Sequence, residues 1–430
     1  MTVYRSNILQ QATPLQLQQA AAHNHSELFA LNAIAQSGEV ITTNGLTYTF
    51  IPGHKNNGMV AFPALTSEDA GKQLDEMMNW YRAHAAVGVG CWSLSPSQPA
   101  DLGARLLARG FQPGWQPCWM ALDLDTIRTG YPKPATLQVQ ADNNTNISQV
   151  KDLPYSGDNG AVSDALMKRY RDRAQRFVAT MDGEIVGHSC VLLTTGPYGV
   201  AGLYNVGVIP EARNKGVGKA VVTAACLFAQ QQGYKYAVLN GTGRRMYNQI
   251  GFEWVGDGLT WWLMANRYIT NPPPAALIAL TEAVCRGEIS SINSMSQQFT
   301  TVQLNTPTAN RMTLMQLATH CRQPAAAEAL AALGAQLAVL DAWDLGWKER
   351  AAALLAVEPE QANRRYGEHN ATLLHIAAER NDLALAQLAL TAHPDLTIKD
   401  STWNAPALGW AHHLQRPDIV TLIKGSMPAH

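Results

Sequence analysis

One stretch of this 430-residue chain constrains its fold and function more than any other. Residues 203–209 (Leu-Tyr-Asn-Val-Gly-Val-Ile) have the pattern of an apolar strand, and Pro210 then begins a turn. The pattern Arg-x-x-Gly-x-Gly follows at Arg213–Gly218, where a helix is expected to begin. The first turn of a helix has unpaired N–H groups and the positive end of the helix dipole. With the basic residues of the loop, these donors predict a site for a phosphate-bearing ligand.

The charge of the chain indicates that anion binding is local. The formal net charge of −1 predicts no general attraction to nucleic acid or to an anionic membrane. Between residues 204 and 250, however, six basic side chains stand against one acidic side chain. The N-terminal sequence does not resemble a secretory signal, and the most apolar run, residues 325–340, is too short and Ala-rich for a membrane span. Six scattered cysteines without Cys-x-x-Cys pairs predict reduced thiols in a cytoplasmic protein.

Two breaks divide the chain into three expected domains, residues 1–132, 133–271 and 272–430. Proline and glycine interrupt the sequence at residues 130–134, and three consecutive prolines follow Asn271. In the middle segment, residues 176–181 and 184–193 predict a β-hairpin around Asp182-Gly183. A helix over residues 217–232, a strand over 236–239, a short helix over 244–250 and a β-rich end over 254–264 predict an α+β fold with a mixed sheet.

The middle segment resembles the GNAT superfamily of acyl-CoA N-acyltransferases from roughly residue 150 to residue 270. The resemblance rests on three elements in order: residues 206–218 (Val-Gly-Val-Ile-Pro-Glu-Ala-Arg-Asn-Lys-Gly-Val-Gly), Gly233-Tyr234, and residues 247–252 (Tyr-Asn-Gln-Ile-Gly-Phe). It implies that the strand backbone pairs with the pantetheine arm of acetyl-CoA, the co-substrate, at Val206, Gly207 and Val208. It implies pyrophosphate binding by Arg213, Asn214, Lys215, Gly216, Val217, Gly218 and Lys219.

The resemblance also implies that Tyr247 is the catalytic residue that protonates the departing thiolate, because a phenol stays protonated at neutral pH. Asn240 closes the neighbouring strand, where its amide either binds acetyl-CoA or substrate or only supports a turn before Gly241. Attack requires a neutral amine, and the candidates for a general base are His188, Glu184 and Asp158.

Residues 1–132 resemble a degenerate copy of the same fold. Residues 102–111 (Leu-Gly-Ala-Arg-Leu-Leu-Ala-Arg-Gly-Phe) align without gaps to residues 243–252, with Leu106 in the place of Tyr247. No Arg-x-x-Gly-x-Gly occurs before residue 130, so a structural or substrate-shaping role is expected for this half. The alternative is an unrelated α/β domain with a chance match.

Residues 272–430 predict an all-α array of ankyrin-like repeats. Residues 372–377 (Thr-Leu-Leu-His-Ile-Ala) are close to the ankyrin signature, and a related run, residues 405–411, follows after about 33 residues. Residues 313–318 have the same apolar pattern, and His375 is expected to bond within its own turn. Such repeats cover one another's apolar faces and offer a surface to a protein partner.

The sequence therefore favours an N-acetyltransferase that acts on a primary amine of a small molecule, for example an antibiotic-like compound in resistance or self-protection. One alternative is a protein acetyltransferase whose repeats recruit the target, and another is a protein that only senses acyl-CoA. No metal site is expected, because neither His320-Cys321 nor His412-His413 has the spacing of metal ligands.

Overall fold

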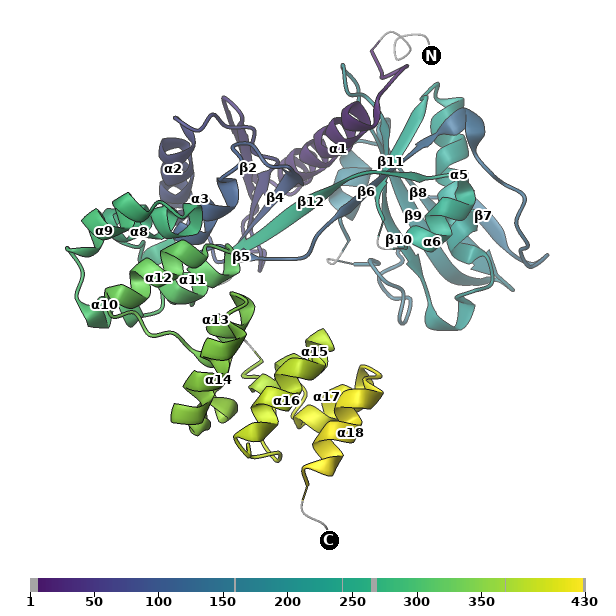
Figure 1. The fold of residues 1–430 in the computed structure, drawn as a ribbon. Coiled ribbons are helices and arrows are strands. Elements are labelled where there is room, and N and C mark those ends of the chain that lie inside the picture. The colour runs from purple at the N-terminus through teal and green to yellow at the C-terminus, as the bar shows by residue number, and fades with distance from the viewer. Residues whose placement is uncertain (1–6, 158–159, 242, 264–268, 368, 428–430) are drawn as a thin grey trace. The chain divides into compact units, whose positions relative to one another are not determined.

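A computed structural model describes residues 7–157, 160–241, 243–263, 269–367 and 369–427. The chain divides into two compact units, Met1–Pro273 and Pro274–His430 (Figure 1). The expected break at the three prolines lies where the units meet, whereas residue 132 lies inside the first unit. The division into three domains stays a prediction.

One sheet organises the described part of the first unit, in the order β1-β2-β3-β4-β12-β6-β11-β10-β9-β8-β7, with β5 beside β12. The strands are β1 (Glu39–Thr43), β2 (Leu46–Phe50), β3 (Gly58–Ala61), β4 (Val89–Ser95), β5 (Gln112–Pro113), β6 (Cys118–Asp123), β7 (Gln138–Ala141), β8 (Ala174–Met181), β9 (Glu184–Leu193), β10 (Ala201–Val208), β11 (Tyr236–Asn240) and β12 (Glu253–Leu263). The helices are α1 (Pro14–Ala35), α2 (Ala70–Ala83), α3 (Leu102–Ala108), α4 (Asp164–Arg169), α5 (Val217–Gln231) and α6 (Arg244–Ile250).

The strand order shows that the two halves of this unit exchange strands. β6 follows α3 of the first half but pairs with β11 of the second, with Trp119 opposite Asn240. β12 follows α6 of the second half but pairs with β4 of the first, with Trp261 opposite Cys91. β6 and β12 also pair with each other in antiparallel register. The exchange joins both halves into one continuous sheet.

The aligned segments of the two halves have the same local structure. The N–H of Phe111 donates to the carbonyl of Leu106, and the N–H of Phe252 donates to the carbonyl of Tyr247, each over 3.1 Å. The glycine before each phenylalanine has positive φ, +96° at Gly110 and +116° at Gly251, a conformation that glycine adopts without strain. Both phenylalanines are buried. These shared contacts give α3 and α6 the same C-terminal geometry, as the alignment of residues 102–111 with 243–252 predicts.

Helix α1 crosses this sheet and touches strands of both halves (Figure 1). It begins at a capping box in which the side chain of Thr13 accepts a hydrogen bond from the N–H of Gln16. Several of its buried side chains are polar, and the amide of Asn24 donates to the carbonyls of Leu192 and Val200. The helix is thus attached to the sheet by hydrogen bonds as well as by apolar contacts.

The second unit consists of paired helices in its described residues. The pairs are α8 (Ala275–Arg286) with α9 (Ile289–Ser296), α11 (Leu314–His320) with α12 (Pro324–Ala332), α13 (Val339–Asp344) with α14 (Lys348–Val357), α15 (Leu373–Arg380) with α16 (Leu383–Thr391), and α17 (Ala407–His413) with α18 (Pro417–Gly425), and α10 (Thr301–Asn305) lies between the first two pairs. The prediction for His375 is confirmed, since its Nδ1 lies 2.8 Å from the hydroxyl of Thr372 and its Nε2 lies 3.1 Å from the carbonyl of Ala405. The assignment to ankyrin repeats stays a prediction.

Candidate active site

The site begins where two parallel strands separate. β10 pairs with β11 only from Ala201 to Leu203, although β10 continues to Val208 and remains paired with β9 on its other side. The register with β9 shifts between Tyr204 and Gly207, where Asn205 has a φ of +50°. A bulge of this kind bends a strand. The backbone of residues 206–208 therefore has no β11 partner, and the carbonyl of Val208 accepts a hydrogen bond from Nε of Arg213 over 3.4 Å.

Close packing explains the glycine in this open strand. A Cβ on Gly207 would collide with the carbonyl of Pro154 and lie 3.0 Å from Nε2 of His188. The loop that contains Pro154 thus packs directly against the separated part of β10. A side chain at residue 207 would displace this loop.

The predicted phosphate loop opens helix α5 as expected. Gly216 occupies the N-cap with a φ of +83°, and no side chain caps the helix there. Arg213 and Lys215 are exposed, whereas Val217 is buried and anchors the first turn. The N–H groups of this turn, the helix dipole and the cations together favour an anion at this place.

The segment between the halves lies beside this loop, which the sequence did not indicate. A Cβ on Gly216 would lie 2.7 Å from the carbonyl of Pro132. Nζ of Lys219 lies 5.5 Å from the centre of the Tyr131 ring. Lys133 is exposed next to the loop and adds a cation to it. Because residues 130–134 have the composition of a linker, only the three-dimensional structure reveals this proximity.

Tyr247 lies on α6 with its side chain almost buried. Its residue is 6% exposed, and its ring meets Phe252 edge-on at 5.9 Å between centroids. Burial, with a smaller contribution from the neighbouring Tyr155, raises the pKa of Tyr247 to about 12. The phenol therefore keeps its proton at all physiological pH values. Tyr155, on the same loop as Pro154, is a neighbour that the sequence did not single out.

Asn240 has a contact within the sheet. Its Oδ1 accepts a hydrogen bond from the N–H of Cys118 over 3.2 Å, which ties β11 to the first residue of β6. This contact favours a supporting role for the amide oxygen. The amide nitrogen has no hydrogen-bond partner among the described residues, and its contact with a ligand stays a prediction.

The three candidate bases differ in position. His188 is fully buried, its Nε2 lies 2.8 Å from the carbonyl of Pro154, and burial lowers its pKa to about 4. These contacts indicate a structural histidine. Glu184 is exposed at the hairpin turn, beyond the point where Gly187 faces Val208, and so lies toward the phosphate end of β10. Asp158 lies outside the described residues.

In the first half, the residues before the corresponding helix carry a different charge. Helix α2 follows Glu68 and Asp69, and the hydroxyl of Thr66 donates to the carboxylate of Asp69. Carboxylates at this position repel phosphate groups. Leu106, which replaces the tyrosine, is fully buried.

Two further properties of the described residues concern metal ions and membranes. No group of histidine, cysteine and acidic side chains there is arranged to hold a metal ion. None of the helices there combines the length and apolar character needed to cross a membrane.

The chain is similar to known acetyltransferases. No curated protein matches it in sequence. Among solved structures, a GCN5-related N-acetyltransferase from Kribbella flavida is 15% identical with a TM-score of 0.42, covering 56% of this chain and 95% of that one. A tandem GNAT protein from the clavulanic acid biosynthesis pathway is 16% identical with a TM-score of 0.38, covering 57% and 95%. Residues 145–252, which contain the separated strand, the glycine loop and Tyr247, match the model of the acetyltransferase (GNAT) family. These residues form a GNAT acetyltransferase domain.

Proposed function

We propose that this protein is an acyl-CoA-dependent N-acyltransferase, in the simplest case one that transfers acetyl from acetyl-CoA to a primary amine of a small molecule. One observation carries the proposal: β10 leaves β11 just before an uncapped, basic helix N-terminus, with a protonated tyrosine on the following helix. An extended chain that ends in a pyrophosphate matches a bare strand edge that leads into an anion site.

Successive residues of β10 and of the loop after it match successive parts of acetyl-CoA. The backbone of Val206, Gly207 and Val208 would pair with the pantetheine arm, as a further strand pairs with a sheet edge. Residues 213–219 would bind the pyrophosphate, and Lys133 would add a cation. When bound, acetyl-CoA supplies the activated acyl group.

Tyr247 and the strand backbone would support the transfer itself. Direct attack by a neutral amine produces an oxyanion, which an N–H near Val206 would stabilise. The phenol of Tyr247 would donate a hydrogen bond to the departing sulfur. His188 is too deeply buried to accept the proton of the amine, so this proton would leave through Glu184, Asp158 or water.

Thiol release tests the proposal. The full chain would be incubated with acetyl-CoA and a panel of small amines, amino sugars and lysine peptides, while free thiol is measured and acetylated product is identified by mass. We expect release with at least one small amine. Absence of binding to acetyl-CoA and to longer acyl-CoA in calorimetry would overturn the proposal.

A further inference from the structure

A polar cavity lies between the two halves of the first unit. Its volume is about 1090 Å³, large enough for a drug-sized ligand. Helix α1, the β2–β3 connection, residues 143–148, Gly157, residues 160–163 and helix α4 form its walls. Its lining includes six asparagines: Asn32, Asn56, Asn57, Asn143, Asn144 and Asn146. Phe29, Ile51 and Met59 are the large apolar side chains there. Such a lining matches a hydrophilic ligand with several hydrogen-bonding groups.

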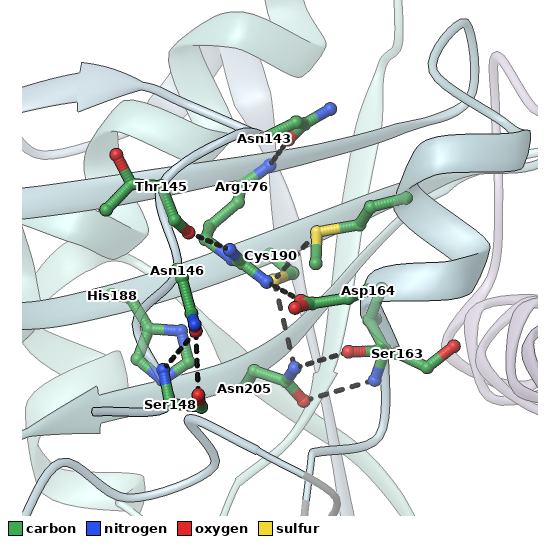
Figure 2. A network of polar contacts seen from close by, with 12 residues as sticks. Asn143, Thr145, Asn146, Ser148, Ser163, Asp164, Arg176, His188, Cys190 and Asn205 are labelled. Carbon is green, nitrogen blue, oxygen red and sulfur yellow. Dashed lines mark hydrogen bonds and ion pairs between the residues drawn. The ribbon is translucent and has the colours of Figure 1, made fainter. Parts of the chain in front are cut away.

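Buried polar side chains hold the second-half wall in place (Figure 2). The guanidinium of Arg176, on β8, donates to the carbonyl of Thr145 over 3.0 Å and pairs with Asp164. The amide of Asn205 binds the backbone of Ala161 and Val162. A loop that is fixed by buried hydrogen bonds presents its remaining polar groups in a fixed geometry.

The same loop connects the cavity to the separated strand. A Cβ on Gly160, which lines the cavity, would lie 2.8 Å from Nδ2 of Asn205. Gly157 also lines the cavity. Pro154 lies three residues before it, and the carbonyl of Pro154 packs against Gly207. Tyr155 is the electrostatic neighbour of Tyr247. The loop that lines the cavity therefore also borders the separated strand and lies near Tyr247.

The charges of the cavity are not balanced. Lys55 lines the cavity from the β2–β3 connection and Lys168 lines it from α4, and neither has an ion pair or hydrogen bond with a described residue. The carboxylate of Asp164 is paired with Arg176, whose side chain is 4% exposed. His54 uses Nε2 in a contact with Gln36. The cavity is thus lined by two ammonium groups that have no partner in the described part of the chain, whereas its carboxylate has one.

We propose that this cavity binds the acceptor, and that the acceptor is a small hydrophilic amine that also carries a carboxylate or phosphate. This inference rests on the proposed function. The acidic group pairs with Lys55 and Lys168, and the amides bind the polar body of the molecule. The two ammonium groups also favour the neutral form of a nearby amine, which is the form that attacks the thioester.

Pairs of amines that differ only in the acidic group test the acceptor class. Thiol release would be measured for glucosamine 6-phosphate against glucosamine, and for 4-aminobutanoate against 4-aminobutanol. We expect the acid-bearing member of at least one pair to have a kcat/KM at least about tenfold higher. The double variant Lys55→Gln/Lys168→Gln should lose this preference through a higher KM, whereas Lys72→Gln, on the exposed face of α2, should keep it.

The location is tested separately. Asn144→Trp should raise the KM for the acceptor at least about tenfold by filling the cavity, whereas Asn44→Trp, outside the lining, should not. Calorimetry with acetyl-CoA should give the same affinity for both variants. A preference for the neutral amines, a preference that survives the double variant, or acetyl-CoA binding without turnover of any of these amines overturns the inference. Absence of acetyl-CoA binding overturns the proposed function instead.

Discussion

Replacing Tyr247 by phenylalanine removes one oxygen from the candidate active site and leaves the packing of the ring intact. No described residue forms a hydrogen bond with the phenol oxygen, and the contact of the ring with Phe252 needs no hydroxyl. We therefore expect the free energy of unfolding to change by less than about 0.5 kcal/mol. Any loss of activity would then report on chemistry rather than on folding.

The pKa of Tyr247 sets the size of the expected effect. Burial raises it to about 12, whereas an ordinary thiol has a pKa of about 8.5. Complete proton transfer to a thiolate is then unfavourable by about 5 kcal/mol, at 1.36 kcal/mol per pKa unit. A hydrogen bond to the developing thiolate contributes about 1.5–3 kcal/mol. Tyr247→Phe should thus lower kcat by about 10- to 150-fold.

The assay is thiol release with the best amine of the panel, with kcat and the KM for acetyl-CoA measured separately. We expect the KM, and the rise in melting temperature that acetyl-CoA produces, to match those of the unchanged protein. Tyr198→Phe, an exposed tyrosine on a different loop, is the matched control. A kcat within threefold of the unchanged protein would refute the role of Tyr247.

Three further perturbations have outcomes that follow from the structure. Gly207→Ala should weaken acetyl-CoA binding at least tenfold in calorimetry, because its Cβ collides with the carbonyl of Pro154; unchanged affinity would contradict the strand site. His188 is neutral in the folded protein, where its pKa is about 4, against 6.5 in the unfolded chain. This difference corresponds to about 3 kcal/mol of stability, which is fully present above pH 6.5 and is lost as the pH falls through 4. In urea unfolding, His188→Gln should therefore show a pH slope smaller by up to about 1.4 kcal/mol per unit between these values, and an equal slope would refute the buried neutral state. His375→Ala should lower the free energy of unfolding of the second unit by about 1–3 kcal/mol without changing acetyl-CoA affinity, since its hydrogen bonds join the Thr372 turn to Ala405; an unchanged unfolding free energy would show that these bonds contribute little.

Local elements of the second half could be predicted because their signals are close together in sequence. Asp182 and Gly183 both have positive φ, as the predicted tight turn requires, and the strands on either side form the hairpin. Helix α6 has the predicted bounds, Arg244–Ile250, and Gly251 ends it with positive φ. The glycine loop before α5 could be predicted for the same reason.

Other features depend on contacts between distant residues. The strand exchange could not be predicted from the sequence. β6 and β12 have the same apolar character, so the sequence does not show with which half each strand pairs. Helix α1 was not predicted, because its buried face includes polar residues such as Asn24 and Asn32 whose partners lie more than a hundred residues away. The cavity and the approach of residues 131–133 to the phosphate loop have no local signal for the same reason.

The stoichiometry and affinity of acetyl-CoA binding test the central claim most directly. Isothermal titration of the full chain should give one acetyl-CoA per chain, since the loop before α5 is basic and uncapped while the entrance of α2 is acidic. Arg213→Gln/Lys219→Gln should weaken the affinity at least about tenfold, as expected for the loss of two phosphate contacts. Two molecules per chain, no binding, or an affinity that these substitutions leave unchanged would contradict the account.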